Sequence, residues 1–217
     1  FLIKNLSNPA QTITDNTITK EQKIAQTFMV GFSSSDTETM KSVVSKYKIG
    51  GIFFVTGEDN RGLNKQFFTD LAKSSGSKMF IASDDEGGEV SRFTKGVTPS
   101  AADMGKMSVE EVKAKGVEAG KILADRGLTG DLAPVLDIAT DGTPWTQYGR
   151  NWSNNPDEIS SKAGAFASGL YSNGIKPVYK HFPGIGKVTE NTDDKKTSAQ
   201  SLASLSEDLK PYANLAG

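Results

Sequence analysis

Three groups of charged residues in this chain have side chains suited to proton transfer and to strong hydrogen bonding. They are Asp84-Asp85-Glu86, Asp137 and Lys180-His181, and each directly follows a mainly apolar run. Carboxylates accept hydrogen bonds, Lys donates charge-assisted ones, and His can do either near neutral pH. Taken singly, each group has a structural interpretation, because such an aspartate can cap a turn and a lysine can simply be solvated. The recurrence of the pattern after three runs favours one common site.

The runs that precede these groups predict buried β-strands. They are short, apolar and bounded by turn residues, and they do not alternate with polar residues as a half-exposed strand would. Five are expected, at residues 28–32, 52–55, 79–82, 132–136 and 175–179.

Helices are expected between these strands. Apolar residues recur at helical spacing in residues 40–47, 63–71, 109–123 and 159–170, with shorter helices expected at 20–26 and 206–215. Thr19 with Gln22 and Ser108 with Glu111 form capping boxes, and Asn155 caps a helix that starts with Pro156.

Five strands that alternate with helices predict an α/β fold with a parallel sheet covered on both faces. An open doubly wound sheet and a (β/α) barrel both fit this alternation. The open sheet usually carries a glycine-rich phosphate loop after its first strand, and residues 31–36 read Gly-Phe-Ser-Ser-Ser-Asp instead. A barrel collects its catalytic groups from several strand ends at one face, as seen here. We therefore expect a TIM-type (β/α) barrel with about five βα units.

Composition restricts the classes of function. The 217 residues are 36% hydrophobic and 24% charged, and 25 Lys and Arg face 26 Asp and Glu. No long basic run offers a path for a nucleic acid, and no apolar run is long enough to span a membrane. Without cysteine and with one histidine, the chain lacks the usual ligands of a catalytic zinc. Its many Ser, Thr, Asn and Lys residues favour a secreted or cell-surface bacterial protein over a cytoplasmic one, and its start at Phe1 suggests that a segment was removed upstream.

Four ordered motifs resemble glycoside hydrolase family 3, and in particular its β-N-acetylhexosaminidase branch. Residues 84–93 (DDEGGEVSRF) resemble the family pattern D-x-E-G-G-x-V-x-R, and residues 132–138 (LAPVLDI) resemble A-P-V-x-D. Gly149-Arg150 resembles the family's G-R turn, and residues 180–184 (KHFPG) match its K-H-F-P-G.

This resemblance implies a retaining exo-β-N-acetylhexosaminidase that removes terminal β-linked N-acetylglucosamine from peptidoglycan or chitin fragments. It implies a carbohydrate substrate, no cofactor and no metal. Gly87-Gly88 and Gly184 are expected to serve backbone geometry. The residues expected to bind the sugar are Asp84, Arg92, Asp137, Arg150, Lys180 and His181.

The loop that carries the acid/base in this branch departs from the family pattern P-G-H-G-x-x-x-x-D-x-H. Read without gaps, Ile185, Asn191 and Asp193 replace the family's His, Asp and His. Asp193 is the candidate proton donor, provided that burial raises its pKa. The alternative is that this charged stretch is only a solvated loop.

The length of the chain bears on the domain organisation. We expect an N-terminal extension at residues 1–18 and a partial barrel domain at 19–217, because an eight-unit barrel needs about 250 residues. The family nucleophile, an aspartate after the seventh strand, is expected beyond Gly217. Five units leave two open sheet edges, which predict association through these edges or with a missing C-terminal part.

Three other functions stay open at this stage. The altered acid/base loop fits a non-catalytic sugar-binding protein. Other branches of the family act on β-glucosides or β-xylosides. Lys180 could also serve a Schiff-base aldolase.

Overall fold

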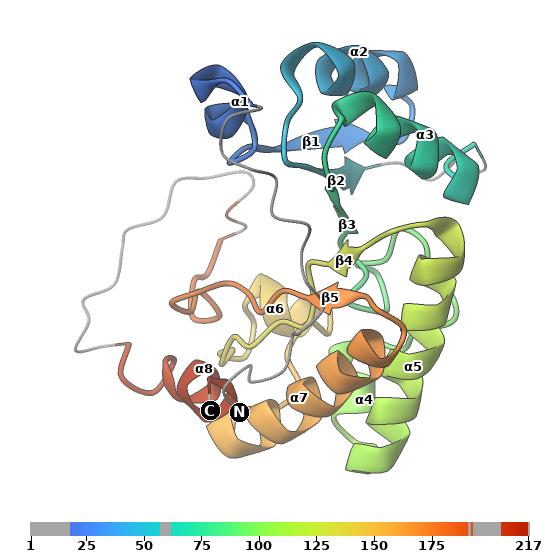
Figure 1. The fold of residues 1–217 in the computed structure, drawn as a ribbon. Helices are drawn as coiled ribbons and strands as arrows, with labels where there is room; N and C mark the ends of the chain where they lie inside the picture. Colours follow the sequence, from blue (N-terminus) through green and yellow to red (C-terminus); the bar gives the residue numbers. More distant parts are fainter. Residues whose placement is uncertain (1–17, 57–61, 191, 193–204, 217) are drawn as a thin grey trace.

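The computed structural model describes residues 18–56, 62–190, 192 and 205–216, and it shows an α/β fold with one parallel sheet (Figure 1). The sheet order is β1-β2-β3-β4-β5, so each strand pairs with the next along the chain. A doubly wound sheet reverses its strand order at a switch point. The sequential order is that of a (β/α) barrel. The strands are β1 (Met29–Ser33), β2 (Gly51–Thr56), β3 (Phe80–Ser83), β4 (Gly130–Asp131) and β5 (Lys176–Pro177).

Helices separate the strands, and several start where the sequence predicts. The capping boxes at Thr19 and Ser108 both form, and the Asn155 side chain accepts from the backbone N–H groups of residues 157 and 158. Gly127, in the left-handed region at φ 96°, ends the longest described helix. The helices are α1 (Lys20–Ala25), α2 (Thr37–Tyr47), α3 (Lys65–Ser75), α4 (Ala101–Met104), α5 (Val109–Arg126), α6 (Pro144–Gln147), α7 (Pro156–Ser172) and α8 (Lys210–Leu215).

Helices α5 and α7 lie side by side and bury much of the core between them and the sheet (Figure 1). Glycines allow this close approach. A Cβ added at Gly116 would lie 2.2 Å from the carbonyl oxygen of Phe166, and one at Gly169 would lie 2.4 Å from that of Lys113. No other residue type would let the two backbones come this close without a shift.

Several predicted boundaries are wrong. The fourth strand was expected at residues 132–136, but β4 ends at Asp131. Pro134 has no N–H to donate to a sheet ladder. Beyond Asp131 the pairing continues irregularly, through single hydrogen bonds such as that from the Val178 N–H to the Ala133 carbonyl oxygen and through an isolated bridge between Val135 and Lys180. Helices α4 and α6 were not expected, since four residues are too few to show a period. Helix α8 begins at Lys210, four residues later than expected.

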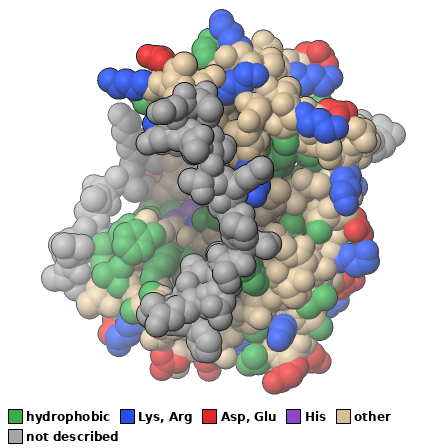
Figure 2. All heavy atoms as spheres, in the orientation of Figure 1, with side chains coloured by type: hydrophobic (Ala, Val, Ile, Leu, Met, Phe, Trp, Pro, Cys, Tyr) green, Lys and Arg blue, Asp and Glu red, His purple; other side chains and the backbone are tan. Residues whose placement is uncertain are grey.

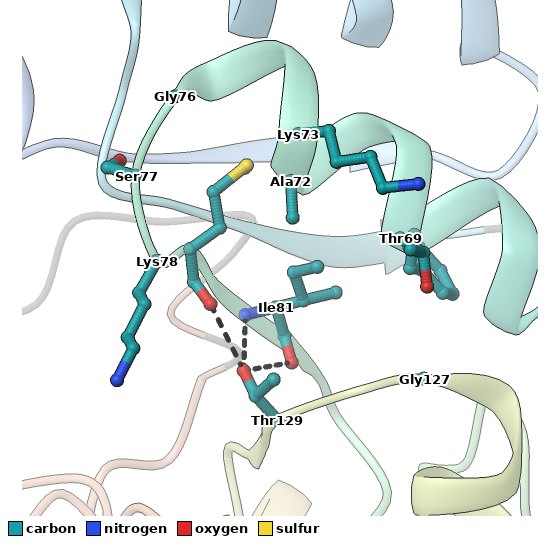
Figure 3. A pocket seen from close by; sticks show the side chains of 11 residues that line it. Thr69, Ala72, Lys73, Gly76, Ser77, Lys78, Ile81, Gly127 and Thr129 are labelled. Carbon is teal, nitrogen blue, oxygen red and sulfur yellow. Dashed lines mark hydrogen bonds between the residues drawn. The ribbon is translucent and has the colours of Figure 1, made fainter.

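A cavity of about 540 Å³ lies beside α3, at the amino ends of β3 and β4 (Figure 3). Its lining includes Phe68, Ala72, Met79 and Ile81, and Thr129 accepts a hydrogen bond from the Ile81 N–H at 2.8 Å. The cavity is thus at the opposite end of the strands from the charged groups. Among the helices of the described ranges, none has the length and apolar character needed to cross a membrane.

Candidate active site

Parallel strands bring the predicted site residues to one edge of the sheet. Asp84 directly follows β3, and Lys180 and His181 lie three and four residues after β5. Val135 pairs with Lys180 in a parallel bridge, which places Asp137 close to His181. Arg150 joins them from the loop between α6 and α7.

Glu86 is the centre of a buried ion-pair network. Its Oε2 accepts a hydrogen bond from Arg150 Nε, and its Oε1 accepts one from an Arg150 terminal nitrogen, both at 2.8 Å. Lys180 Nζ lies 2.7 Å from the same Oε1 and also contacts Asp84 Oδ1. The Glu86 side chain is only 3% exposed, whereas those of Asp84, Arg150 and Lys180 are 15–19% exposed. The three partly exposed groups can therefore reach a ligand while Glu86 fixes the two cations.

The network holds its members in their charged forms. Burial would raise the pKa of Glu86, but the charge of Lys180 and the hydrogen bonds and charge of Arg150 outweigh it and lower this pKa. Burial would likewise lower the pKa of Lys180, but the charges of Glu86 and Asp84 raise it above its ordinary value. A lysine kept protonated is a poor nucleophile, which argues against the Schiff-base chemistry considered for Lys180.

His181 is oriented by a buried carboxylate. Its Nδ1 lies 2.6 Å from Asp137 Oδ2, and an Arg150 terminal nitrogen lies 3.3 Å from its Nε2. Because a guanidinium only donates, this arrangement fits the tautomer with the proton on Nδ1. The other Asp137 oxygen accepts the Ile185 N–H at 2.7 Å, so Asp137 also fixes the loop that follows β5.

The indole ring of Trp145, in α6, packs next to Arg150 and His181. The Arg150 guanidinium carbon lies 5.1 Å from the centre of the indole ring, within cation–π range, and the His181 ring centre lies 5.9 Å away. Trp145 is buried, whereas the His181 side chain is 29% exposed. Figure 2 shows the chain's one histidine, in purple, set back from the surrounding surface beside hydrophobic side chains.

The predicted sugar-binding residues thus have different places. Asp84, Arg150, Lys180 and His181 lie together, with part of each side chain exposed. Asp137 lies behind His181 with a fully buried side chain, a place suited to orienting that ring and not to touching a ligand. Arg92 is held in the same loop as Asp84 by its backbone N–H, which donates to Asp85 Oδ1 at 3.1 Å.

Two residues of this site, Glu86 and Trp145, were not among the residues predicted to bind the sugar. Glu86 stands in the D-x-E-G-G motif, and that position was the signal which could have identified it. Trp145 has no such signal in the sequence. Asp193, the predicted proton donor, lies outside the described residues.

The loop after β5 has the tight backbone that its glycines predict. Gly184 has φ 126°, and a Cβ there would lie 2.7 Å from Asp208 Cβ. Gly87 and Gly88 have φ values of 97° and 61°, which also confirms their expected backbone role. Ile185 stands where the family pattern has a histidine, and Lys187 beyond it pairs with the buried Asp208 at 2.8 Å.

The arrangement suits a neutral ligand rich in hydroxyl groups. Two carboxylates, Asp84 and Glu86, balance two cations, Lys180 and Arg150, so the network has no strong net charge to attract an ion. Carboxylate oxygens can accept from hydroxyl groups, and Lys and Arg can donate to them. Within the described ranges, no group of three or more histidine, aspartate or glutamate side chains is placed to hold a metal ion.

Comparison with known proteins gives consistent matches. Residues 19–216 match the model of the glycosyl hydrolase family 3 N-terminal domain. The chain is 31% identical over 204 residues to the β-hexosaminidase LpqI of Mycobacterium tuberculosis, which covers 91% of this chain and 52% of that protein. The chain thus spans about half the length of the curated relatives it matches.

Solved structures show the same similarity. The β-N-acetylhexosaminidase of Beutenbergia cavernae matches with a TM-score of 0.78 at 27% identity, over 91% of this chain and 64% of that one. NagZ of Neisseria gonorrhoeae, solved with N-trifluoroacetyl-D-glucosamine, matches with a TM-score of 0.72 at 26% identity, over 86% and 59% of the two chains.

Proposed function

Because this chain belongs to glycosyl hydrolase family 3, we propose that its parent protein is a retaining exo-β-N-acetylhexosaminidase. Its substrate would be a peptidoglycan or chitin fragment, from which it removes the terminal β-linked N-acetylglucosamine. The observation that carries this proposal is the network of Asp84, Glu86, Arg150 and Lys180 beside His181, at the carboxyl ends of barrel strands. The similarity to β-hexosaminidases supports this choice of sugar.

In this proposal the described site holds the sugar at the non-reducing end. Asp84 accepts from hydroxyl groups, while Lys180 and Arg150 donate to sugar oxygens. His181 presents Nε2 beside Arg150, and Asp137 keeps the ring oriented. Arg92 is proposed as a further sugar contact from the loop after β3.

Hydrolysis with retention requires a nucleophile and a group that first donates and then accepts a proton. We assign the proton transfer to Asp193 and place the nucleophile outside these 217 residues. The activity therefore belongs to the whole protein.

A second candidate is a sugar-binding protein without catalysis. The observation that favours it is Ile185, which occupies the position of the first histidine of the family pattern. Its apolar side chain cannot transfer a proton, and its backbone N–H donates to Asp137. Binding of N-acetylglucosamine without turnover of its aryl β-glycoside would favour this candidate, and clear turnover would exclude it. Faster turnover of an aryl β-glucoside or β-xyloside would instead favour another branch of the family.

The test uses two lysines of the same segment in the intact protein. Lys180→Met removes a partly buried cation paired with two carboxylates, whereas Lys176→Met changes an exposed residue of β5. We expect kcat/KM for an aryl N-acetyl-β-glucosaminide to fall at least about 10-fold in Lys180→Met, since a hydrogen bond from a charged group contributes about 1.5–3 kcal/mol. Lys176→Met should match the wild type. Equal activity of all three proteins would exclude the proposed site.

A further inference from the structure

Two fully buried aspartates lie next to the network but form none of its ion pairs. Asp85 is the second residue after β3, and Asp131 is the last residue of β4. Ser83 pairs with Asp131 in the sheet, and the Asp85 N–H donates to Asp131 Oδ1 at 3.0 Å. Neighbouring carboxyl groups in a dry interior disfavour each other's ionisation, and the charge of Asp85 raises the pKa of Asp131, as its burial does, so one of the two should hold a proton.

Asp85 is the one with partners for a negative charge. Its Oδ1 accepts from the N–H groups of Arg92, Phe93 and Thr94 at 3.1, 2.9 and 2.8 Å. The Thr94 hydroxyl donates to the same oxygen at 2.9 Å, and the Ser83 hydroxyl donates to Oδ2 at 2.5 Å. Several donors to one carboxylate stabilise its charged form. Asp85 therefore carries the charge and closes the loop between residues 85 and 94.

Asp131 has no such set of donors. Among the described residues, its Oδ1 accepts the Asp85 N–H and its buried Oδ2 has no hydrogen-bond partner. The nearby cation, Lys180, is already paired with Asp84 and Glu86. Burial raises the pKa of Asp131 well above its ordinary value, and the charges of Asp85 and Asp84 raise it too, against the lowering effects of the Asp85 N–H and Lys180.

We propose that Asp131 is a protonated, neutral carboxyl at neutral pH and that it positions the Asp84–Glu86 segment by accepting the Asp85 N–H. It is a positioning residue, because it acts through Asp85 on the carboxylates on either side, Asp84 and Glu86. The neutrality of Asp131 matters, since a further negative charge there would compete with Asp84 and Glu86 for Lys180. The link to sugar binding rests on the proposed function, whereas the protonation state of Asp131 does not.

The first test compares Asp131→Asn, which keeps the shape and the neutrality, with Asp85→Asn. Folded wild type would keep a proton that the unfolded chain releases above pH ~3.9, so its stability should fall as pH rises. Denaturant titrations should show the unfolding constant of the wild type rising about tenfold per pH unit relative to Asp131→Asn, until the folded pKa is reached. Asp85→Asn should be destabilised at neutral pH, because it removes the negative charge that the N–H groups of residues 92–94 and the hydroxyl groups of Ser83 and Thr94 stabilise.

Spectroscopy of the intact protein reports the protonation state of Asp131 directly, which a measurement of stability alone does not. With ¹³C-labelled aspartate, the infrared spectrum at neutral pH should contain a protonated-carboxyl band that is lost in Asp131→Asn. The ¹⁵N–¹H resonance of Asp85 should stay in place in Asp131→Asn and shift in Asp131→Ala. Absence of the band, or an unfolding constant for Asp131→Asn that follows the wild type at every pH, would overturn the proposal.

Sugar titrations separate this proposal from the proposed function. Affinity for N-acetylglucosamine should survive in Asp131→Asn and fall at least about fivefold in Asp131→Ala. If the wild type binds no sugar, the proposed function fails, and the infrared and unfolding results still decide the state of Asp131. Equal sugar affinity of Asp131→Ala and the wild type would refute the positioning role.

Discussion

Replacing Glu86 with glutamine tests whether this carboxylate organises the site. The amide keeps the shape of the side chain but removes the charge that faces Arg150 and Lys180 at 2.7–2.8 Å. Removing one partner of a buried ion pair costs about 3–5 kcal/mol. Lys180 keeps Asp84 as a partner and both cations are 15–17% exposed, so we expect a loss near the lower end, about 3 kcal/mol.

The assay is denaturant unfolding of the wild type, Glu86→Gln and Glu89→Gln. Glu89 is an exposed glutamate three residues further along the same loop, and its replacement should change stability by less than about 0.5 kcal/mol. A loss of about 3 kcal/mol corresponds to a more than 100-fold larger unfolding constant.

The pH dependence of this effect follows from the lowered pKa of Glu86. The stabilisation is fully present above the unfolded pKa of about 4.3 and is lost as pH falls through the lower folded pKa. The gap between wild type and Glu86→Gln should therefore shrink in acid. A Glu86→Gln protein as stable as Glu89→Gln at pH 7, or a gap that widens in acid, would refute the reasoning.

Two further substitutions test the close contact between α5 and α7 and the role of the Trp145 ring. Gly116→Ala should cost about 2 kcal/mol because its Cβ would lie 2.2 Å from the Phe166 carbonyl oxygen, while Gly62→Ala, where the added Cβ meets nothing within 4 Å, should cost much less. Equal melting temperatures of these two variants would contradict the close helix contact. Trp145→Leu should weaken N-acetylglucosamine binding about fivefold by releasing Arg150, and Trp145→Phe should retain most of the affinity, as measured by calorimetry. Unchanged affinity in Trp145→Leu would exclude a role for the ring.

The alternation of strands and helices could be predicted because its signals are local. Thr19 and Ser108 with their capping partners mark helix starts, and apolar runs mark strands. The extent of β4 could not be predicted from the same signals. Leu132–Leu136 has the composition of a strand, but Pro134 lacks an N–H and the ladder ends at Asp131. That outcome depends on pairing with neighbouring strands.

The site was predictable in part for a related reason. Asp84, Lys180 and His181 follow strands, and parallel strands end at the same edge. The different roles of the carboxylates depend on contacts far apart in sequence, such as Glu86 with Arg150. Asp137 shows the limit most clearly, since its position after a strand predicted a sugar contact, whereas its two oxygens engage His181 and Ile185.

Calorimetric titration of the intact protein with N-acetylglucosamine, and with glucose for comparison, tests the central proposal most directly, because binding does not require the nucleophile or the acid. The proposed site predicts saturable binding of N-acetylglucosamine, binding of glucose at least about tenfold weaker, and loss of both in Lys180→Met but not in Lys176→Met. Absence of binding by the wild type, or equal binding by the two lysine variants, would contradict it.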